Sequence, residues 1–195
     1  MSSSRLPGKV LRKIKDVSVL DYLINRIKDI DLIDEFWLAT SFNKADDVIV
    51  KLFKSKIKIF RGSENDVLSR YYDLATKTKA ETIIRITADC PFIDKSIIEK
   101  ALKLFNDKNV DYLSNVLERS YPDGLDVEIF SYQTLKKTYE DCDDLLLREH
   151  VTPYMKTGYY EKFKTGKFKV YNFKNKYDFS HLRWTLDTEE DYVFL

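Results

Sequence analysis

The sequence has few of the residues that cross-link a small protein. It contains only two cysteines, Cys90 and Cys142, with five glycines and four prolines in 195 residues. Two cysteines make neither a disulfide framework nor a zinc site, and such usage is ordinary in a reducing cytoplasm. Neither His150 nor His181 stands at a spacing from Cys90 that indicates nucleophilic catalysis, so we expect a buried, inert thiol. Stability must come from a hydrophobic core, for which 44% hydrophobic residues suffice.

An excess of charge of one sign is also lacking. Lys and Arg number 33, Asp and Glu 32, and the net charge is +1. This balance gives no general attraction to nucleic acid or to a membrane surface. No apolar run approaches the ~20 residues of a transmembrane helix, and the first residues lack the apolar stretch of a signal peptide. We expect a cytoplasmic protein that binds neither nucleic acid nor membrane and holds any anion with a local cluster of cations.

Short β-rich runs alternate with segments of helical periodicity in the first half of the chain. Strands are expected at 35–40, 56–60 and 82–87, and helices at 17–29, 45–55, 66–78 and 95–105. This alternation is typical of βαβ units and a mainly parallel sheet. Later, strands are expected at 111–115, 125–130, 168–173 and 182–185, and helices at 132–141 and 145–157. The Lys- and aromatic-rich segment 159–177 is interpreted as a solvated sheet face.

The first cluster of chemical interest lies at the N-terminus. Ser3, Ser4, Arg5 and Lys9 bring hydroxyls, a guanidinium and an ammonium into one short loop that also offers backbone amides. Such a loop can surround a triphosphate, with Arg5 and Lys9 neutralising its charge. The spacing of a Walker loop is absent. From these residues alone, a flexible basic terminus with a Pro-Gly turn remains an equal alternative.

Two further clusters place an acid where an apolar strand ends. Asp89 follows the strand expected at 82–87, and Asp187 follows the one at 182–185. Ligands of open α/β sheets bind at the carboxyl ends of strands, so both acids are candidate oxygen ligands for Mg²⁺. A turn-capping role is the alternative for Asp89, and Asp94 is expected to cap the next helix. From the residues alone, pairing Asp89 with Asp187 is a hypothesis.

Motifs along the whole chain resemble one family. They are SSRLPGK (3–9), ATS (39–41), FRGSE (60–64), DVL with RY (66–71), TADCP (87–91), YPDGLDVE (121–128), REHVTP (148–153) and LRWTLD (182–187). In this order they resemble the cytidylyltransferases that include CMP-sialic acid and CMP-Kdo synthetases, and most closely the branch for spore-coat polysaccharide biosynthesis.

The resemblance implies a fold and a reaction. The fold would be a Rossmann-like three-layer α/β sandwich of the nucleotide-diphospho-sugar transferase type, with a mixed, mainly parallel sheet. The reaction would transfer CMP from CTP to a sugar or sugar acid and release pyrophosphate, with Mg²⁺, in surface polysaccharide or glycan biosynthesis. Relatives commonly form dimers, so a homodimer is possible.

The resemblance also implies roles for individual residues. Arg5 and Lys9 would hold the triphosphate and act in catalysis together with Asp89 and Asp187, which would bind Mg²⁺. The nucleotide would further contact Ser3, Ser4, Ala39, Thr40, Ser41, Arg61 and Ser63. The sugar would contact Asp123, Gly124, Asp126, Glu128, Arg148, Glu149 and His150. For 148–150 a helix-capping and packing role is the alternative, and Asp126 and His150 are the candidate general bases.

The chain departs from the family at its start. Members begin with an apolar strand and an Ala-Arg pair, whereas here Met1 stands where that strand would already have ended. We therefore expect a single domain over 1–195 that is truncated at both ends and lacks the first, central strand. Such a loss would expose the edges of neighbouring strands. The loss of this strand favours one alternative, a non-catalytic domain that binds nucleotide or serves in assembly. Use of another nucleotide, such as UTP, is a second alternative.

Overall fold

The computed structural model describes residues 1, 3, 5–157, 159 and 167–195. Ser4, one of the expected nucleotide-binding residues, lies outside the described residues, as do 158 and 160–166. The strands are β1 (Lys13–Ile14), β2 (Val17–Ser18), β3 (Trp37–Ser41), β4 (Lys58–Gly62), β5 (Thr82–Arg85), β6 (Tyr112–Ser114), β7 (Glu128–Ser131) and β8 (Val170–Asn172). The α-helices are α1 (Val19–Ile27), α2 (Asp47–Phe53), α3 (Val67–Thr78), α4 (Lys95–Lys108), α5 (Tyr132–Asp141), α6 (Leu145–His150), α7 (Pro153–Lys156) and α8 (Glu189–Phe194).

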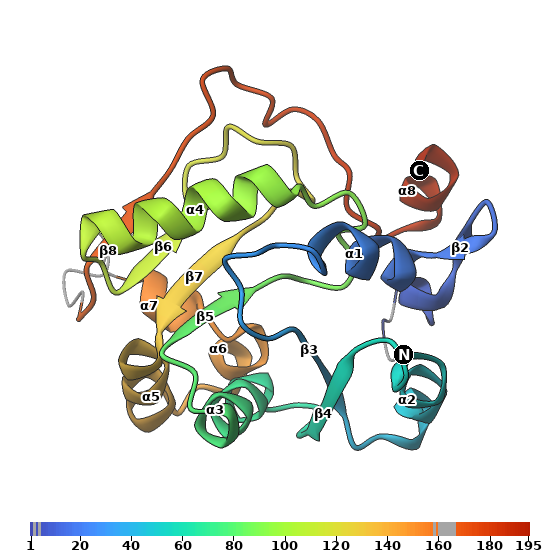
Figure 1. Cartoon of the computed structure of the whole chain (residues 1–195), viewed down its shortest axis with the longest axis horizontal. Helices are drawn as coiled ribbons and strands as arrows, with labels where there is room; N and C mark the ends of the chain where they lie inside the picture. Colours follow the sequence, from blue (N-terminus) through green and yellow to red (C-terminus); the bar gives the residue numbers. More distant parts are fainter. Residues whose placement is uncertain (2, 4, 158, 160–166) are drawn as a thin grey trace.

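The fold is α/β with mixed strand pairing, as predicted, but the four-stranded sheet has two antiparallel pairings and one parallel pairing where a mainly parallel sheet was expected. Four strands form one sheet in the order β5-β7-β6-β8, in which β7 is antiparallel to both neighbours and β6 is parallel to β8. Strands β3 and β4 form a separate parallel pair, and β1 and β2 a short antiparallel one. Figure 1 shows β5, β7 and β6 side by side, with β3 and β4 set apart from them.

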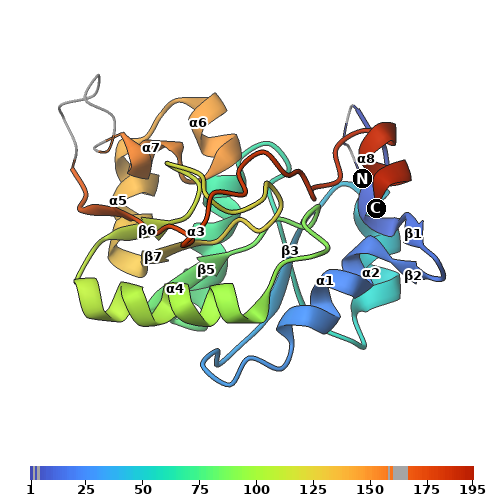
Figure 2. The same cartoon turned by 90° about the horizontal axis from the view of Figure 1, so that it is seen from above.

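Helices cover both faces of the four-stranded sheet. Helices α1 and α4 lie on one side, and α3, α5, α6 and α7 lie on the other (Figure 2). Because side chains alternate along a strand, Leu113 and Ile129 face the first layer, while their neighbours Tyr112 and Phe130 face the second. These four side chains are fully buried, so the strands are sandwiched between two apolar layers.

Side chains cap the helix starts. The side chain of Asp66 accepts a hydrogen bond from the backbone of Ser69 at the start of α3, and Asp94 does the same for Ser96 at α4. Thr188 and Asp191 form the reciprocal capping box of α8. Each cap satisfies backbone N–H groups that have no partner inside the helix. The capping prediction for Asp94 is thereby confirmed.

Two expected elements differ in the structure. The helix predicted over 145–157 is split into α6 and α7 at Val151, which has φ +68°. Pro153 starts α7 because its ring tolerates only the first helical turn. The strand predicted over 182–185 is reduced to one bridge between Arg183 and Asp123. Within the described residues, none of the helices has the length and apolar character needed to cross a membrane.

A cavity lies between β3 and β5. Among the described residues, β3 pairs only with β4 and β5 only with β7, so no ladder joins β3 to β5. A cavity of about 750 Å³ separates them, and its apolar lining includes Leu38 of β3 and Ile84 of β5. The other apolar walls come from Leu23 of α1, Leu74 of α3 and Leu102 of α4. Two strand edges therefore face a space bounded by helices on both sides.

An apolar strand joined ahead of Met1 is expected to fill this space. The Met1 ammonium lies 2.9 Å from Oδ1 of Asp46, and Asp46 also binds Thr40 near the carboxyl end of β3. A segment joined ahead of Met1 would thus end beside the carboxyl end of β3, as a strand parallel to β3 must. Six alternating Val and Ile residues should raise the thermal unfolding midpoint by ~5 °C or more, since each kcal/mol gained is worth about 2–4 °C. A Gly/Ser segment of equal length is the control, and equal midpoints for the two fusions would contradict the expectation.

Candidate active site

Three segments that are far apart in the sequence meet at the ammonium of Lys9. Its Nζ lies 2.6 Å from Oδ2 of Asp89 and 2.8 Å from Oδ1 of Asp187. Lys9 opens a short 3₁₀ turn after Gly8, while Asp89 lies in the loop that follows β5. The backbone N–H of Leu186 donates to the carbonyl of Asp89 at 2.9 Å and fixes the two acidic loops against each other. The structure thus brings together the basic loop and both acids that the sequence singled out.

The charges in this cluster shift one another's pKa. Burial acts to lower the pKa of Lys9, but the two carboxylates outweigh it and raise that pKa above its ordinary value. Burial likewise acts to raise the pKa of Asp187, yet the hydrogen bond and charge of Lys9 hold it below the ordinary value. Both groups are therefore ionised at neutral pH. The cluster is a cation held between anions, in partly buried surroundings where charge interactions are stronger than in water.

Two arginines flank the cluster in different ways. Arg5 Nη2 is 3.3 Å from Oδ1 of Asp187, and its side chain is 65% exposed, so it is free to turn toward a ligand. Arg183 is fixed: it donates to Asp187 at 2.9 Å, to Asp123 at 2.7 Å and to Asp191 at 2.9 Å. Arg183 therefore orients the second carboxylate and links it to the loop that begins at Asp123.

The expected nucleotide residues of β3 are organised by a carboxylate that the sequence did not indicate. Oδ2 of Asp46 accepts hydrogen bonds from the hydroxyls of Thr40 at 2.7 Å and Ser41 at 2.6 Å. Burial acts to raise the pKa of Asp46, but the donors, including the Met1 ammonium, outweigh it and lower that pKa. Since both hydroxyls already donate to Asp46, only their lone pairs remain for a ligand.

The remaining nucleotide candidates lie beside this carboxylate. Arg61 donates to the carbonyls of Ser41 at 2.7 Å and Asn43 at 3.0 Å, so it braces the loop after β3. Ser63 accepts from the backbone of Asp66 at 3.0 Å, and Ala39 lines the 750 Å³ cavity. The side chain of Ser3 accepts from the backbone N–H of Leu6 at 3.3 Å, which closes the N-terminal loop.

A second cavity, of about 300 Å³, contains part of the predicted sugar site. Asp126, Glu128 and His150 line it. Thr87 also lines this cavity. Because Thr87 lies two residues before Asp89, the cavity is next to the Lys9 cluster. Its other walls are Arg85, Val116, Arg119, Thr152, Pro153 and Lys156. This cavity brings the sequence-predicted acids together with cations that the sequence did not single out.

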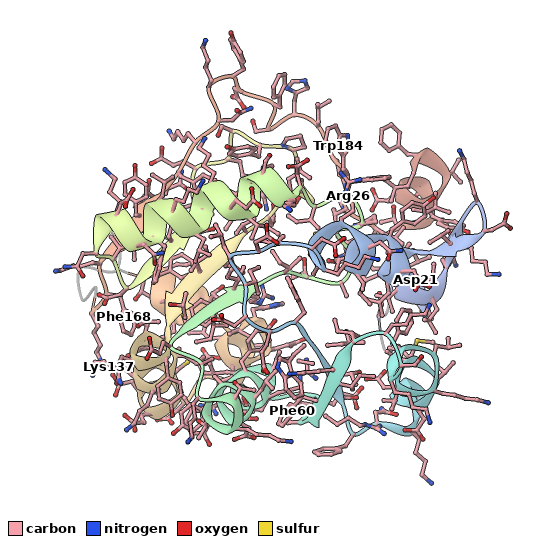
Figure 3. The ribbon with its side chains drawn as sticks, viewed as in Figure 1. Asp21, Arg26, Phe60, Lys137, Phe168 and Trp184 are labelled. Carbon is pink, nitrogen blue, oxygen red and sulfur yellow. The ribbon has the colours of Figure 1, made fainter. Side chains whose placement is uncertain are left out.

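Asp123 and Gly124 hold the cavity in place from outside its lining. Asp123 bonds to Arg183, and the backbone N–H of Trp184 donates to the carbonyl of Asp123 at 2.6 Å. Gly124 has φ +105°, and a Cβ there would stand 2.6 Å from the carbonyl carbon of Trp184, whose side chain is labelled in Figure 3. Only glycine allows the two backbones to approach this closely.

Arg148 and Glu149 do not line the cavity. Arg148 donates to Oδ2 of Asp66 at 3.0 and 2.8 Å and to the carbonyls of Tyr139 and Cys142, which joins α6 to the cap of α3. Glu149 is exposed. Of the motif at 148–150, only His150 contributes to the cavity. The packing alternative considered for this motif thus describes the geometry of Arg148, while a sugar contact by Arg148 or Glu149 stays a prediction.

The sequence carried a local signal for the pairing of Arg85 with Glu128, which sequence reasoning did not predict. Each of the two residues places a charge between the apolar residues of an expected strand, and a charge at a buried strand position requires a partner. They are in fact partners across the β5-β7 ladder, where their backbones are in register. No comparable signal marks Lys156 or Arg183, because their partners come from distant segments.

The comparisons with known proteins agree with this geometry. The family model described as Cytidylyltransferase matches residues 1–193. This chain belongs to the cytidylyltransferase family. A solved cytidylyltransferase structure from Leptospira borgpetersenii is 34% identical, with a TM-score of 0.90, and the match covers 98% of this chain and 79% of that one. The spore coat polysaccharide biosynthesis protein SpsF of Bacillus subtilis is 28% identical over 98% of this chain and 80% of its own length. The predicted family and its CTP-dependent enzyme class are confirmed.

More distant solved structures share the fold alone. A CMP:2-keto-3-deoxy-manno-octonic acid synthetase complexed with CTP is 14% identical, with a TM-score of 0.69 over 99% of this chain and 92% of that one. Rv0371c of Mycobacterium tuberculosis, in complex with manganese, is 13% identical, with a TM-score of 0.64 over 99% of this cytidylyltransferase and 93% of that chain. The predicted Rossmann-like sandwich of the nucleotide-diphospho-sugar transferase type is thereby confirmed.

Replacement of Gly124 tests how tightly the loop at 123–124 is held against Trp184. We expect Gly124→Ala to lower the free energy of unfolding by more than ~2 kcal/mol, because the new Cβ meets backbone atoms and the positive φ adds strain. Urea unfolding measures the change. Gly8→Ala is the matched control: its φ is +69°, but its Cβ meets only the end of the Met1 side chain at 3.2 Å. Equal losses in the two variants would contradict the role of the close approach.

Proposed function

We propose that this cytidylyltransferase transfers the CMP group of CTP to a sugar or sugar acid and releases pyrophosphate, in surface polysaccharide or glycan biosynthesis. The observation that carries the proposal is the Lys9 ammonium held between Asp89 and Asp187, beside the 300 Å³ cavity. Charged groups of both signs suit a triphosphate and its counterion, and the cavity offers room for an acceptor. The printed names of the relatives in polysaccharide and CMP-sugar synthesis support this assignment.

The chain's own residues supply charge and position. Arg5 and Lys9 hold the triphosphate, and the acceptor oxygen in the cavity attacks the α-phosphorus in line. The new phosphorus–oxygen bond forms as the bond to the β-phosphate oxygen breaks, and pyrophosphate leaves with the electron pair. The cations stabilise the charge that develops on the leaving group. The acceptor proton passes to a base on the cavity wall.

The donor set around Lys9 fits a divalent cation. Asp89 and Asp187 each place one oxygen within 2.8 Å of the same ammonium nitrogen, so a small cation can be shared by both. Among the residues that the structure describes, no three His, Cys, Asp or Glu side chains converge on one point, so phosphate oxygens and water would complete the coordination. Mg²⁺ held there would neutralise phosphate charge. Manganese in the distant relative Rv0371c agrees with a divalent ion.

His150 is the better placed of the two candidate bases. Both side chains line the cavity. The two carboxylate oxygens of Asp126 accept from Arg119 at 2.7 and 2.8 Å, so this bidentate pair already engages both of them. Among the described residues, no charged side chain forms an ion pair with the ring of His150. We therefore assign proton transfer to His150.

Pyrophosphate release with CTP, Mg²⁺ and a panel of nonulosonic acids tests the reaction. Lys9→Met and Asp89→Asn should each lower kcat/KM by about 10²–10³-fold, the usual cost of removing a group that stabilises transition-state charge. Asp31→Asn, a change at an exposed loop carboxylate, is the control and should leave the rate unchanged. The proposal would be contradicted if both variants kept the wild-type rate, or if the wild type released no pyrophosphate with any acceptor.

A second candidate function is nucleotide binding without turnover. The unpaired edges of β3 and β5 beside the 750 Å³ cavity favour it, because they loosen the sheet that carries Asp89. Calorimetry separates the two candidates: Mg²⁺-dependent CTP binding with pyrophosphate release supports the enzyme, and binding without release supports the alternative. UTP titrated in parallel tests the preference for the base.

A further inference from the structure

Arg183 contacts three carboxylates at once. Its Nη2 donates to Oδ2 of Asp187 at 2.9 Å and to Oδ2 of Asp191 at 3.1 Å. Its Nε donates to Oδ1 of Asp191 at 2.9 Å, and its Nη1 donates to Oδ2 of Asp123 at 2.7 Å. The N–H donors of a guanidinium lie in one rigid plane, so these contacts fix the three carboxylates relative to one another.

The two oxygens of Asp187 have different partners. Arg183 engages Oδ2, whereas Oδ1 lies 2.8 Å from Nζ of Lys9 and 3.3 Å from Nη2 of Arg5. Lys9 and Arg5 are the cations to which we assign the triphosphate, and a ligand that binds them leaves Oδ1 without its present partners. Asp187 therefore offers one oxygen to a divalent ion, and the guanidinium withholds the other.

Asp89 is restricted in a similar way. Its Oδ2 lies 2.6 Å from Nζ of Lys9, and its Oδ1 accepts from the thiol of Cys90 at a sulfur–oxygen distance of 3.6 Å. The sulfur in turn lies 3.1 Å from Oγ1 of Thr87. Cys90 is only 3% exposed, so this weak contact is shielded from water. Asp89 and Asp187 thus each direct one oxygen to Lys9 and hold the other against a donor of the protein.

The acids next to this pair are engaged as well. Both oxygens of Asp191 accept from Arg183, and Oδ2 also accepts from the backbone N–H of Asp187 at 2.8 Å. Asp123 is held between Arg183 and Arg119. Arg183 therefore engages four carboxylate oxygens, one of which belongs to a predicted metal ligand.

We infer that Arg183 is a specificity-determining residue for the divalent ion: it limits Asp187 to one coordinating oxygen and so favours Mg²⁺ over Ca²⁺. This inference rests on the proposed function in one respect, namely that Asp89 and Asp187 hold a divalent ion together with the triphosphate. Mg²⁺ demands a near-octahedral set of ligands and takes few carboxylates, whereas Ca²⁺ accepts more oxygens and bidentate carboxylates. A guanidinium on Oδ2 excludes the bidentate mode.

Binding of CTP to the full chain tests this role, with Mg²⁺ or Ca²⁺ as the sole divalent ion and no acceptor. Calorimetry gives the two dissociation constants and hence the preference between the ions. We expect tighter binding with Mg²⁺ in the wild type. Arg183→Met should lower the preference by about 10-fold or more, the scale of one hydrogen bond to a charged group, because the freed oxygen of Asp187 allows bidentate coordination. Arg183→Lys keeps a charged donor and should retain most of the preference.

Arg12→Met is the matched control. Arg12 pairs with Glu189 and lies over the ring of Tyr192, so it also joins the N-terminal segment to α8, but none of its described contacts involves Asp187. It should leave the preference unchanged, because a looser α8 weakens CTP binding with both ions equally.

Thermal midpoints show which variants are folded, and Arg183→Gln replaces Arg183→Met if the latter is not, with the same expected direction. The inference is overturned if loss of the guanidinium leaves the preference unchanged, or if Arg12→Met changes it as much. Wild-type CTP binding that is the same with Mg²⁺, with Ca²⁺ and without either ion overturns it too.

The outcome is separable from that of the proposed reaction. A preference between the ions that depends on Arg183 supports the inference even when no pyrophosphate is released from CTP, and in that case the transferase proposal alone fails. Pyrophosphate release together with an ion preference that Arg183→Met does not change supports the transferase and overturns the inference.

Discussion

The structure depends on one lysine between two aspartates. Lys9 joins Asp89 and Asp187, which are 80 and 178 residues away in the sequence. Without a cation the two carboxylates would repel each other, so the basic loop, the end of β5 and the last segment can meet only around positive charge. Partly buried ion pairs repay little of their desolvation, so this contact fixes where the three segments meet and adds little to the net free energy of unfolding.

The sequence predicted the features that depend on local physics. Period and length placed the helices, and Asp94 was identified as a cap because a helix start needs an acceptor for its free N–H groups. Asp89 and Asp187 were found by the same kind of reasoning, from an acid that follows an apolar run. That they meet at Lys9 could be expected only from the family resemblance, because no local pattern encodes a contact over 178 residues.

The features that sequence reasoning did not reach depend on tertiary partners. The packing role left open for Arg148 depends on Asp66 and on two carbonyls that accept from its guanidinium, and those contacts are invisible in the sequence. Lys156 was one lysine among many until Glu128 proved to be buried beside it. The split of the helix expected at 145–157 reflects the left-handed backbone at Val151, an unusual conformation for a β-branched residue.

The two halves of the site are joined by charges that alternate in sign. From Lys9 the contacts run through Asp187 to Arg183, then through Asp123 to Arg119 and Asp126 on the cavity wall. Asp187, Arg183 and Asp123 each pair with two groups of the opposite sign. Removing one of them therefore leaves two like charges without their common partner. One continuous chain of ion pairs therefore links Lys9 to the wall of the 300 Å³ cavity.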